Sequence, residues 1–199
     1  MGTFFDICKT GDIDRVVKFL RSQNSPTQET LDATDSTQGK SGLHYATEQS
    51  QTQMVEYLLN KGSKVDSRDR LLRTPLHLAC LGGNSVVAKM LLEFNADPFE
   101  RDSSGRTSMH YACCTGSVVA ALELIMVLCQ RHTDLVHMKD HTGRTPLHYS
   151  IFNQQADMNK IILKLIQFGA NINAIDVDSR TPLHFASEAG KGKICQLMI

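Results

Sequence analysis

The sequence predicts an all-α fold, a solenoid of stacked helix pairs joined by short turns, and three observations lead to this prediction. The string Thr-Pro-Leu-His occurs at residues 74–77, 145–148 and 181–184, and related strings occur in the same frame at 41–44 and 107–110. Successive strings begin 33, 33, 38 and 36 residues apart, and apolar residues at helical spacing follow them. A period of this length is typical of repeat proteins, in which each unit packs on its neighbours.

Each string marks the start of an inner helix. Its Ser or Thr can cap the free backbone amides there, and in three strings Pro occupies the first helical position, where a missing N–H costs nothing. Gly83, Gly116 and Gly190 indicate where inner helices end. The apolar residue of each string and the small residue three positions later are expected to face the core, and these pairs are Leu43 and Ala46, Leu76 and Ala79, Met109 and Ala112, Leu147 and Ser150, and Leu183 and Ala186.

An outer helix is expected after each inner helix, followed by a hairpin turn. Apolar residues at helical spacing predict outer helices around 54–59, 87–92 and 161–166. Segments such as Asp102-Ser-Ser-Gly105 and Asp140-His-Thr-Gly143 then read as tight turns. Leu72 and Ser179 replace the turn glycine, so altered turns are expected at these two positions.

These strings, their period and the Gly-Arg-Thr junctions resemble the ankyrin-repeat family across essentially the whole chain. The resemblance implies a single domain, 1–199, an ankyrin-repeat solenoid of helix-turn-helix units joined by short β-hairpin turns. We expect about six repeats, with a divergent N-terminal cap, four complete repeats and an incomplete last one: 1–33, 34–66, 67–99, 100–137, 138–173 and 174–199. Helices are expected at 4–8 and 13–20 of the cap, and a mobile loop at 24–28.

Two repeats exceed the period. The extra residues lie between Gly116 and Thr133 in one repeat and at 154–157 in the other, and both insertions should lengthen the outer helices or their turns. A second surface could form there.

Composition excludes several functional classes. Twenty-one basic residues balance twenty-one acidic ones, so nothing indicates binding to nucleic acid or to an anionic membrane. No apolar run is long enough for membrane insertion, and we expect a monomer in the cytoplasm, with the nucleus as an alternative. Reduced thiols are expected, since Cys8, Cys80, Cys113 and Cys195 occupy core-facing positions.

Five histidines recur in register, at 44, 77, 110, 148 and 184. Each lies three residues after a Ser or Thr, so its ring can bond that hydroxyl or the backbone at the helix start. The family resemblance implies that these histidines tie adjacent repeats together. We therefore favour a structural role over a catalytic one.

The remaining histidines suggest a zinc-like set, Cys129, His132, His137 and His141. Repeat geometry argues against it, because Cys129 is expected near the end of an outer helix and His141 at a hairpin tip. No nucleophilic triad, phosphate-binding loop or paired carboxylates are recognisable. The sequence therefore predicts no enzyme activity, no metal and no cofactor.

The residue after each repeated histidine is Tyr45, Leu78, Tyr111, Tyr149 or Phe185. These side chains could form a peptide-binding ladder or pack between inner helices, and both interpretations stay open. A basic residue stands at each hairpin-to-helix junction: Lys40, Arg73, Arg106, Arg144 and Arg180. Pairing with the turn aspartates at 69, 102, 140 and 176 is favoured for these cations over binding an acidic partner.

Leu71, Leu81 and Phe152 are apolar at positions expected to be exposed, which favours a binding role. The candidate partner-binding residues are Tyr45, Arg70, Leu71, Leu81, Arg106, Tyr111, Cys114, His141, Arg144, Tyr149, Phe152 and Phe185.

The predicted function is a protein–protein interaction module that binds a peptide segment or a folded partner through its concave face. One alternative is the recognition arm of a larger multidomain enzyme, such as a kinase, an acyltransferase or a ubiquitin-ligase adaptor. The sequence predicts an apolar helical face formed by Ile194, Leu197, Met198 and Ile199. This face is expected to be exposed to solvent, which supports that alternative. Another is an ankyrin-only inhibitor that covers the active site of its partner.

Overall fold

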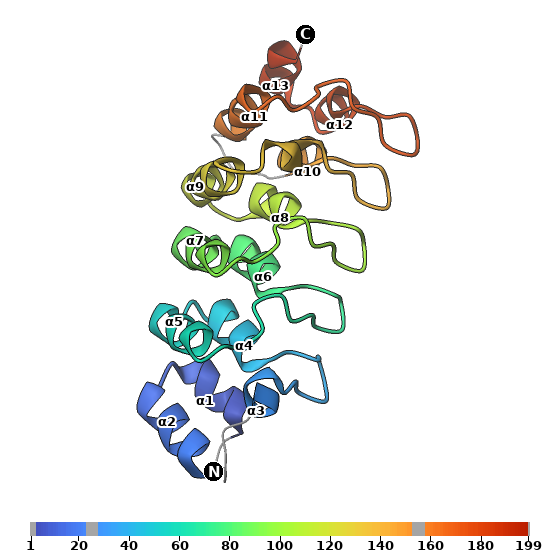
Figure 1. The fold of residues 1–199 in the computed structure, drawn as a ribbon. Helices are drawn as coiled ribbons and strands as arrows, with labels where there is room; N and C mark the ends of the chain where they lie inside the picture. The colour runs from blue at the N-terminus through green and yellow to red at the C-terminus, as the bar shows by residue number, and fades with distance from the viewer. Residues whose placement is uncertain (1–2, 23–27, 153–157, 199) are drawn as a thin grey trace. The chain divides into compact units, whose positions relative to one another are not determined.

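The computed structural model describes residues 3–22, 28–152 and 158–198. Within these ranges every regular element is a helix, apart from one isolated antiparallel bridge between Thr34 and Ser41. The all-α prediction is therefore confirmed. The contacts divide the chain into an N-terminal unit, Met1–Asp97, and a C-terminal unit, Pro98–Ile199 (Figure 1). Among the described residues no helix is long and apolar enough to cross a membrane.

The N-terminal unit begins with a helix pair that packs onto the first motif-bearing repeat. Helix α1 packs on α2 and α4, α4 packs on α5 and α6, and α6 packs on α7. The helices are α1 Phe4–Thr10, α2 Ile13–Ser22, α3 Gln28–Asp32, α4 Gly42–Glu48, α5 Thr52–Asn60, α6 Pro75–Leu81 and α7 Ser85–Glu93.

One helix of this unit was not predicted from the sequence. Gln28 begins the short helix α3, where the sequence suggested a loop, because its side-chain amide donates to Asp32 (2.8 Å) and to the carbonyl of Gly62. The rest of the suggested loop, 24–27, lies outside the described residues.

The C-terminal unit repeats the same arrangement, with α8 packed on α9 and α10, α10 on α11 and α12, and α12 on α13. Its elements are α8 Ser108–Cys114, α9 Val118–Cys129, the 3-10 helix η1 Thr133–His137, α10 Pro146–Phe152, α11 Met158–Gln167, α12 Pro182–Glu188 and α13 Gly192–Leu197.

The longer fourth repeat is explained by α9 and η1. Helix α9 has 12 residues and η1 follows it, so the extra residues lengthen the outer side as predicted. Helix α8 ends at Cys114, with Thr115 rather than Gly116 as its C-cap. The second insertion, 154–157, lies outside the described residues.

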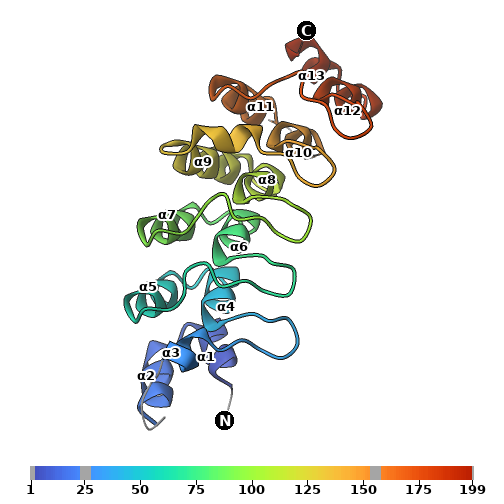
Figure 2. The same cartoon turned by 45° about the vertical axis from the view of Figure 1, so that its right-hand side comes forward.

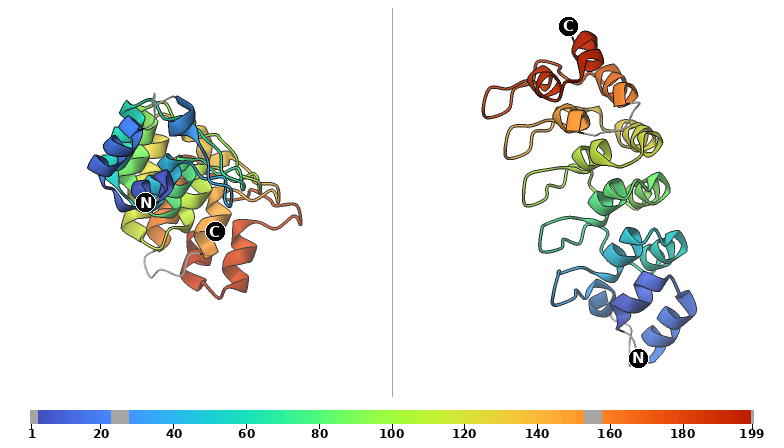
Figure 3. Two further views of the ribbon diagram at one scale, coloured as in Figure 1. Left: turned by 90° about the horizontal axis from the view of Figure 1, so that it is seen from below. Right: turned by 180° about the vertical axis from the view of Figure 1, so that it is seen from behind.

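Within each unit the hairpin turns project from the same side as the inner-helix starts. In the N-terminal unit the turns before α4 and α6 point away from the outer helices α5 and α7 (Figure 2). In the C-terminal unit the turns before α8, α10 and α12 point away from α9 and α11 (Figure 3). The inner helices and turns thus share one side of each unit.

The turns keep one backbone geometry even where glycine is missing. In one turn the Asp102 amide donates to the carbonyl of Arg106 (3.0 Å), and the Gly105 amide donates to the carbonyl of Asp102 (2.9 Å). Gly105 has φ +79° and the corresponding Leu72 and Ser179 have φ +58° and +61°. The prediction of altered turns was therefore wrong. The paired hydrogen bonds hold a non-glycine residue in the left-handed region at a steric cost.

The apolar residues at the end of α13 are largely buried, which corrects the expectation that they are exposed to solvent. Ile194 and Met198 are only 4% and 6% exposed, because α13 packs on α12. Leu197 is half-buried, and Ile199 lies outside the described residues. Of the four cysteines expected in the core, three are buried and Cys195 is half-buried.

Candidate functional site

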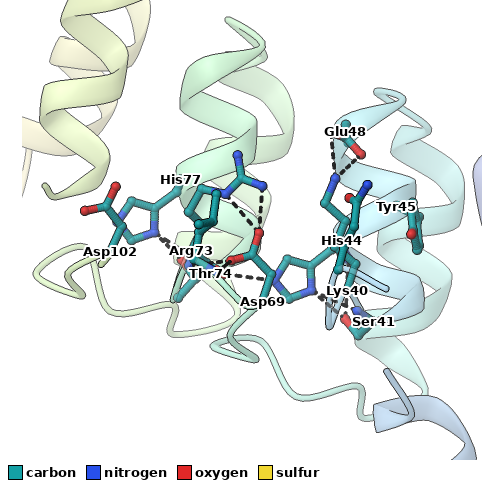
Figure 4. Close-up of polar contacts among 12 residues, drawn as sticks. Lys40, Ser41, His44, Tyr45, Glu48, Asp69, Arg73, Thr74, His77 and Asp102 are labelled. Carbon is teal, nitrogen blue, oxygen red and sulfur yellow. Dashed lines mark hydrogen bonds and ion pairs between the residues drawn. The ribbon is translucent and has the colours of Figure 1, made fainter. Parts of the chain in front are cut away.

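The repeated histidines connect the start of one inner helix to the turn of the next repeat. In the N-terminal unit, His44 Nδ1 accepts a hydrogen bond from the Ser41 amide (3.1 Å) and lies 2.9 Å from its hydroxyl (Figure 4). Because Nδ1 is an acceptor, Nε2 carries the proton, and it donates to the carbonyl of Arg73 over 3.0 Å. The ring therefore caps α4 and holds the following turn.

The C-terminal unit has the same connection twice. His110 Nε2 donates to the carbonyl of Arg144 (3.2 Å), and His148 Nε2 donates to the carbonyl of Arg180 (3.3 Å). Burial lowers the pKa of His110 to about 4, although the hydrogen bond to Arg144 opposes the shift. A neutral ring with both nitrogens engaged is a structural group, so the predicted structural role is confirmed for His44, His110 and His148.

The zinc-like set is spread over different environments. Cys129 is buried in α9, and the His132 ring makes an edge contact with Phe99 at 5.5 Å. At a hairpin tip, the His141 amide donates to the carbonyl of Ser104 (2.9 Å). The part of the chain that the structure describes contains no group of three or more His, Cys, Asp or Glu side chains able to hold a metal ion.

The aromatic residues after the histidines are largely buried. Tyr45, Tyr111 and Phe185 are only 7%, 6% and 6% exposed. Each tyrosine hydroxyl donates to the aspartate of its own turn, Asp35, Asp102 or Asp140, over 2.9, 2.7 and 2.6 Å. Hydrogen-bonded, buried rings fit the packing interpretation and leave little ring area to touch a partner.

The apolar residues predicted to be exposed are exposed. Phe152, Leu71 and Leu81 have 50%, 51% and 45% of their surface accessible. Cys114, Arg70 and His141, also among the candidate residues, lie on the surface. Ile175 and Val177, at the last turn, are exposed as well, and sequence reasoning did not single them out. Apolar residues at a turn position that is usually polar were the signal that could have found them.

Phe152 belongs to a compact group at the end of α10 that we name the Phe152 cluster: Arg144, Phe152, Arg180 and Phe185. The two phenylalanine rings meet edge to face with centroids 5.3 Å apart. The Arg144 guanidinium lies 5.8 Å from the Phe152 centroid and 5.0 Å from that of Phe185. Arg180 lies 4.5 Å from the Phe185 centroid. Both arginines therefore lie over the buried Phe185 ring, and Arg144 also lies beside the exposed Phe152 ring.

Most junction cations are neutralised within the chain. In the N-terminal unit Arg73 pairs with Asp69 (2.7 Å), whereas Lys40 pairs with Glu48 (2.7 Å), where the sequence favoured a turn aspartate (Figure 4). In the C-terminal unit, Arg106 pairs with the aspartate of its own turn (2.8 Å) and Arg180 with those at 176 and 178 (3.4 and 3.1 Å).

Arg144 is the exception among these cations. Its Nε is 3.5 Å from Asp176 Oδ2 and makes no hydrogen bond. The aspartate of its own turn, Asp140, instead accepts hydrogen bonds from the hydroxyls of Thr142 and Tyr149. Arg144 therefore pairs with a turn aspartate, as the sequence favoured, but with Asp176 of the next turn and only at 3.5 Å.

Comparison with known proteins agrees with this repeat geometry. Models of ankyrin repeats match residues 38–70, 62–112 and 121–199. The chain belongs to the ankyrin-repeat family. The fold is shared with an ankyrin repeat domain from Acinetobacter baumannii AYE, at 26% identity and a TM-score of 0.81, over 98% of this chain and 95% of that one.

A second structural neighbour is a chain in the structure of a predatory endopeptidase from Bdellovibrio bacteriovorus in complex with an immunity protein. It has 20% identity and a TM-score of 0.81, over 100% of this ankyrin-repeat chain and 97% of that one, and it shows the fold alone.

The ankyrin-repeat chain is also similar to parts of much longer proteins. It is 40% identical over 131 residues to the transient receptor potential channel pyrexia of Drosophila melanogaster, covering 64% of this chain and 12% of the channel. It is 31% identical over 154 residues to rabankyrin-5 of Mus musculus, covering 76% of this chain and 13% of that protein. The chain therefore spans about an eighth of the length of these relatives.

Proposed function

We propose that this chain binds a partner protein through the inner-helix side of its C-terminal unit, with the Phe152 cluster at the centre of the contact. Ankyrin-repeat domains are generally protein–protein interaction modules without enzymatic activity. The observation that carries the proposal is the half-exposed Phe152 ring, which meets Phe185 edge to face and lies beside Arg144. Aromatic residues, Phe included, and Arg are enriched at protein–protein interfaces.

The neighbouring surface supports the same assignment. Two other candidate residues of the C-terminal unit are also exposed: Cys114 at the end of α8 and His141 at a turn tip. The proposed binding needs no metal or cofactor and would depend on shape and side-chain complementarity. The inner-helix side of an ankyrin array is commonly its concave face, so this proposal retains the concave-face prediction.

The test is a variant pair with a matched control. Partners are captured with the photo-crosslinking residue benzoylphenylalanine at position 152, and with the same residue at position 163. Binding to the captured partner is then measured for Phe152→Ala and for Leu163→Ala, which removes a side chain of similar exposure (44%) from α11. We expect at least tenfold weaker binding for Phe152→Ala only, which corresponds to about 1.4 kcal/mol or more.

The opposite pattern would overturn the proposal. If Leu163→Ala weakens binding while Phe152→Ala does not, the partner binds the outer-helix side. Circular dichroism spectra of both variants would show whether either has lost its fold.

We also propose that the chain acts as a recognition segment of a longer protein. The lengths of pyrexia and rabankyrin-5 support this second proposal, since each carries a matching segment within a far larger chain. Sequencing the full transcript would test it: an open reading frame that ends at Ile199 would refute it.

A further inference from the structure

We propose that the Phe152 cluster recognises an Asp or Glu side chain next to a large apolar residue in an extended segment of the partner. This inference rests on the proposed function, and it names the chemistry of the partner. Arg144 would bind the carboxylate and Phe152 would be covered by the apolar neighbour.

The first argument is the incomplete pairing of Arg144. A guanidinium has five N–H donors, and it binds a carboxylate best through two parallel hydrogen bonds. Arg106 is closely paired inside the chain, since its Nε donates to Asp102 Oδ2 at 2.8 Å and an Nη lies 2.8 Å from the same oxygen. The Arg144 Nε is buried without a hydrogen bond, and its nearest acid is 3.5 Å away, so a partner carboxylate would have to reach the Nη groups of this partly exposed side chain.

That nearest acid is also shared. Asp176 Oδ2 lies 3.5 Å from Arg144 and 3.4 Å from Arg180. Arg180 has a second acid, Asp178, at 3.1 Å, whereas the acid nearest to Arg144 is shared. Another cation lies close to Phe152, because the ammonium of Lys191 donates to the carbonyl of Ile151. A carboxylate added beside Phe152 would therefore have Arg144 and Lys191 as neighbouring cations.

The second argument comes from an equivalent position in the N-terminal unit. Lys40 and Glu48 are eight residues apart, as are Arg144 and Phe152. The Lys40 ammonium is bound by both oxygens of Glu48, at 2.8 and 2.7 Å, and lies 5.4 Å from the Tyr45 ring (Figure 4). In that repeat the helix end supplies the carboxylate for the junction cation.

In the repeat of α10 the helix end supplies a phenyl ring instead. Phe152 cannot neutralise Arg144, although its ring and that of Phe185 hold the guanidinium in place. A pre-positioned cation loses little side-chain entropy on binding. A partner carboxylate would occupy the place that Glu48 occupies beside Lys40, and Phe152 would add apolar contact area next to it.

The test uses defined peptides and the whole chain. Random twelve-residue peptides with amidated C-termini are selected on the immobilised protein and counter-selected on Phe152→Ala. The strongest peptide is synthesised with its acidic residue intact and as the Asn or Gln analogue. Dissociation constants are measured by fluorescence polarisation for the wild type, Arg144→Gln and the charge-matched control Arg131→Gln, an exposed arginine next to α9.

We expect the selected peptides to share an Asp or Glu within two residues of a large apolar side chain. Removing the carboxylate should weaken binding to the wild type and to Arg131→Gln about tenfold, as expected for loss of charged hydrogen bonds. The same change should have little effect on Arg144→Gln, because the interacting cation is already absent. Phe152→Glu should abolish acidic-peptide binding by supplying a carboxylate within the chain.

Three results would overturn the inference. If the amide analogue loses as much affinity on Arg144→Gln as on the wild type, Arg144 does not contact the acid. If the peptides that depend on Phe152 contain no acidic residue, the proposed acidic specificity is refuted, although the proposed binding surface is not. If no peptide depends on Phe152, the binding surface falls as well.

Discussion

Acidification should destabilise the protein well before its carboxylates are protonated, because three of the histidines that start inner helices, His44, His110 and His148, are held neutral. Burial lowers the pKa of His110 from 6.5 to about 4, and it also lowers the pKa values of His44 and His148. Between these pH values the unfolded chain binds protons that the folded protein excludes. The free energy of unfolding therefore falls as the pH falls through this window.

The pKa shift of His110 gives the size of the effect. With a pKa of 6.5 in the unfolded chain and about 4 in the folded one, His110 alone accounts for a loss of about 2 kcal/mol between pH 7 and pH 5. The carboxylates affect stability at lower pH than the histidines do. Burial opposes the ionisation of Asp102 and Asp140, but hydrogen bonds to their carboxylates outweigh it and lower their pKa below 3.8. Their contribution is lost only as the pH falls below that value.

Urea unfolding followed by circular dichroism at pH 7, 6 and 5 would measure this loss. His110→Gln should be less stable at pH 7, by about 1–3 kcal/mol through the lost hydrogen bonds, and should show about 2 kcal/mol less pH dependence. His141→Gln, at an exposed turn, is the control and should keep the wild-type profile. The reasoning is refuted if His110→Gln retains the full pH dependence.

Three further predictions concern turns, tyrosines and metals. Ser179→Gly should raise the free energy of unfolding by about 0.5–1 kcal/mol, because φ is +61° there, while Gly143→Ser should lower it; urea unfolding that shows the reverse order would contradict this. Tyr149→Phe should cost about 2 kcal/mol in the same assay, since it removes a 2.6 Å hydrogen bond to Asp140. A chelator should leave the melting temperature unchanged, and a drop of several degrees in calorimetry would point to a bound metal.

Sequence reasoning succeeded where a side chain acts within its own repeat. The spacing of Thr107 and His110 predicted the ring contact at the start of α8, and that contact is present at 3.0 Å. Sequence reasoning failed where hydrogen bonds of the surrounding backbone determine the local conformation. Leu72 keeps a glycine-like φ because the turn hydrogen bonds impose it. Helix α3 has five residues with only Leu31 buried, too short a segment to show an apolar period.

The candidate site was only partly predictable, because the junction cations look alike in the sequence. Each stands just before a repeated string, yet Lys40 binds Glu48, Arg106 binds Asp102, and Arg144 lies over two phenylalanine rings. Their partners depend on which side chains other positions and the next repeat bring within reach. The repeated tyrosines were the more conspicuous pattern in the sequence. Their rings pack inside the protein, however, and their hydroxyls donate hydrogen bonds to the aspartates of their own turns.

A junction cation that is closely paired within the chain has few groups left for a partner. Binding is therefore best sought where one repeat departs from such close pairing. In this chain the departure is Arg144, whose nearest acid is 3.5 Å away and shared with Arg180, beside the exposed ring of Phe152. If the departure serves binding, Phe152→Glu should restore the internal pairing of the Lys40 repeat and raise stability while it abolishes binding. A variant that gains stability yet still binds an acidic peptide would separate the two properties and exclude this explanation.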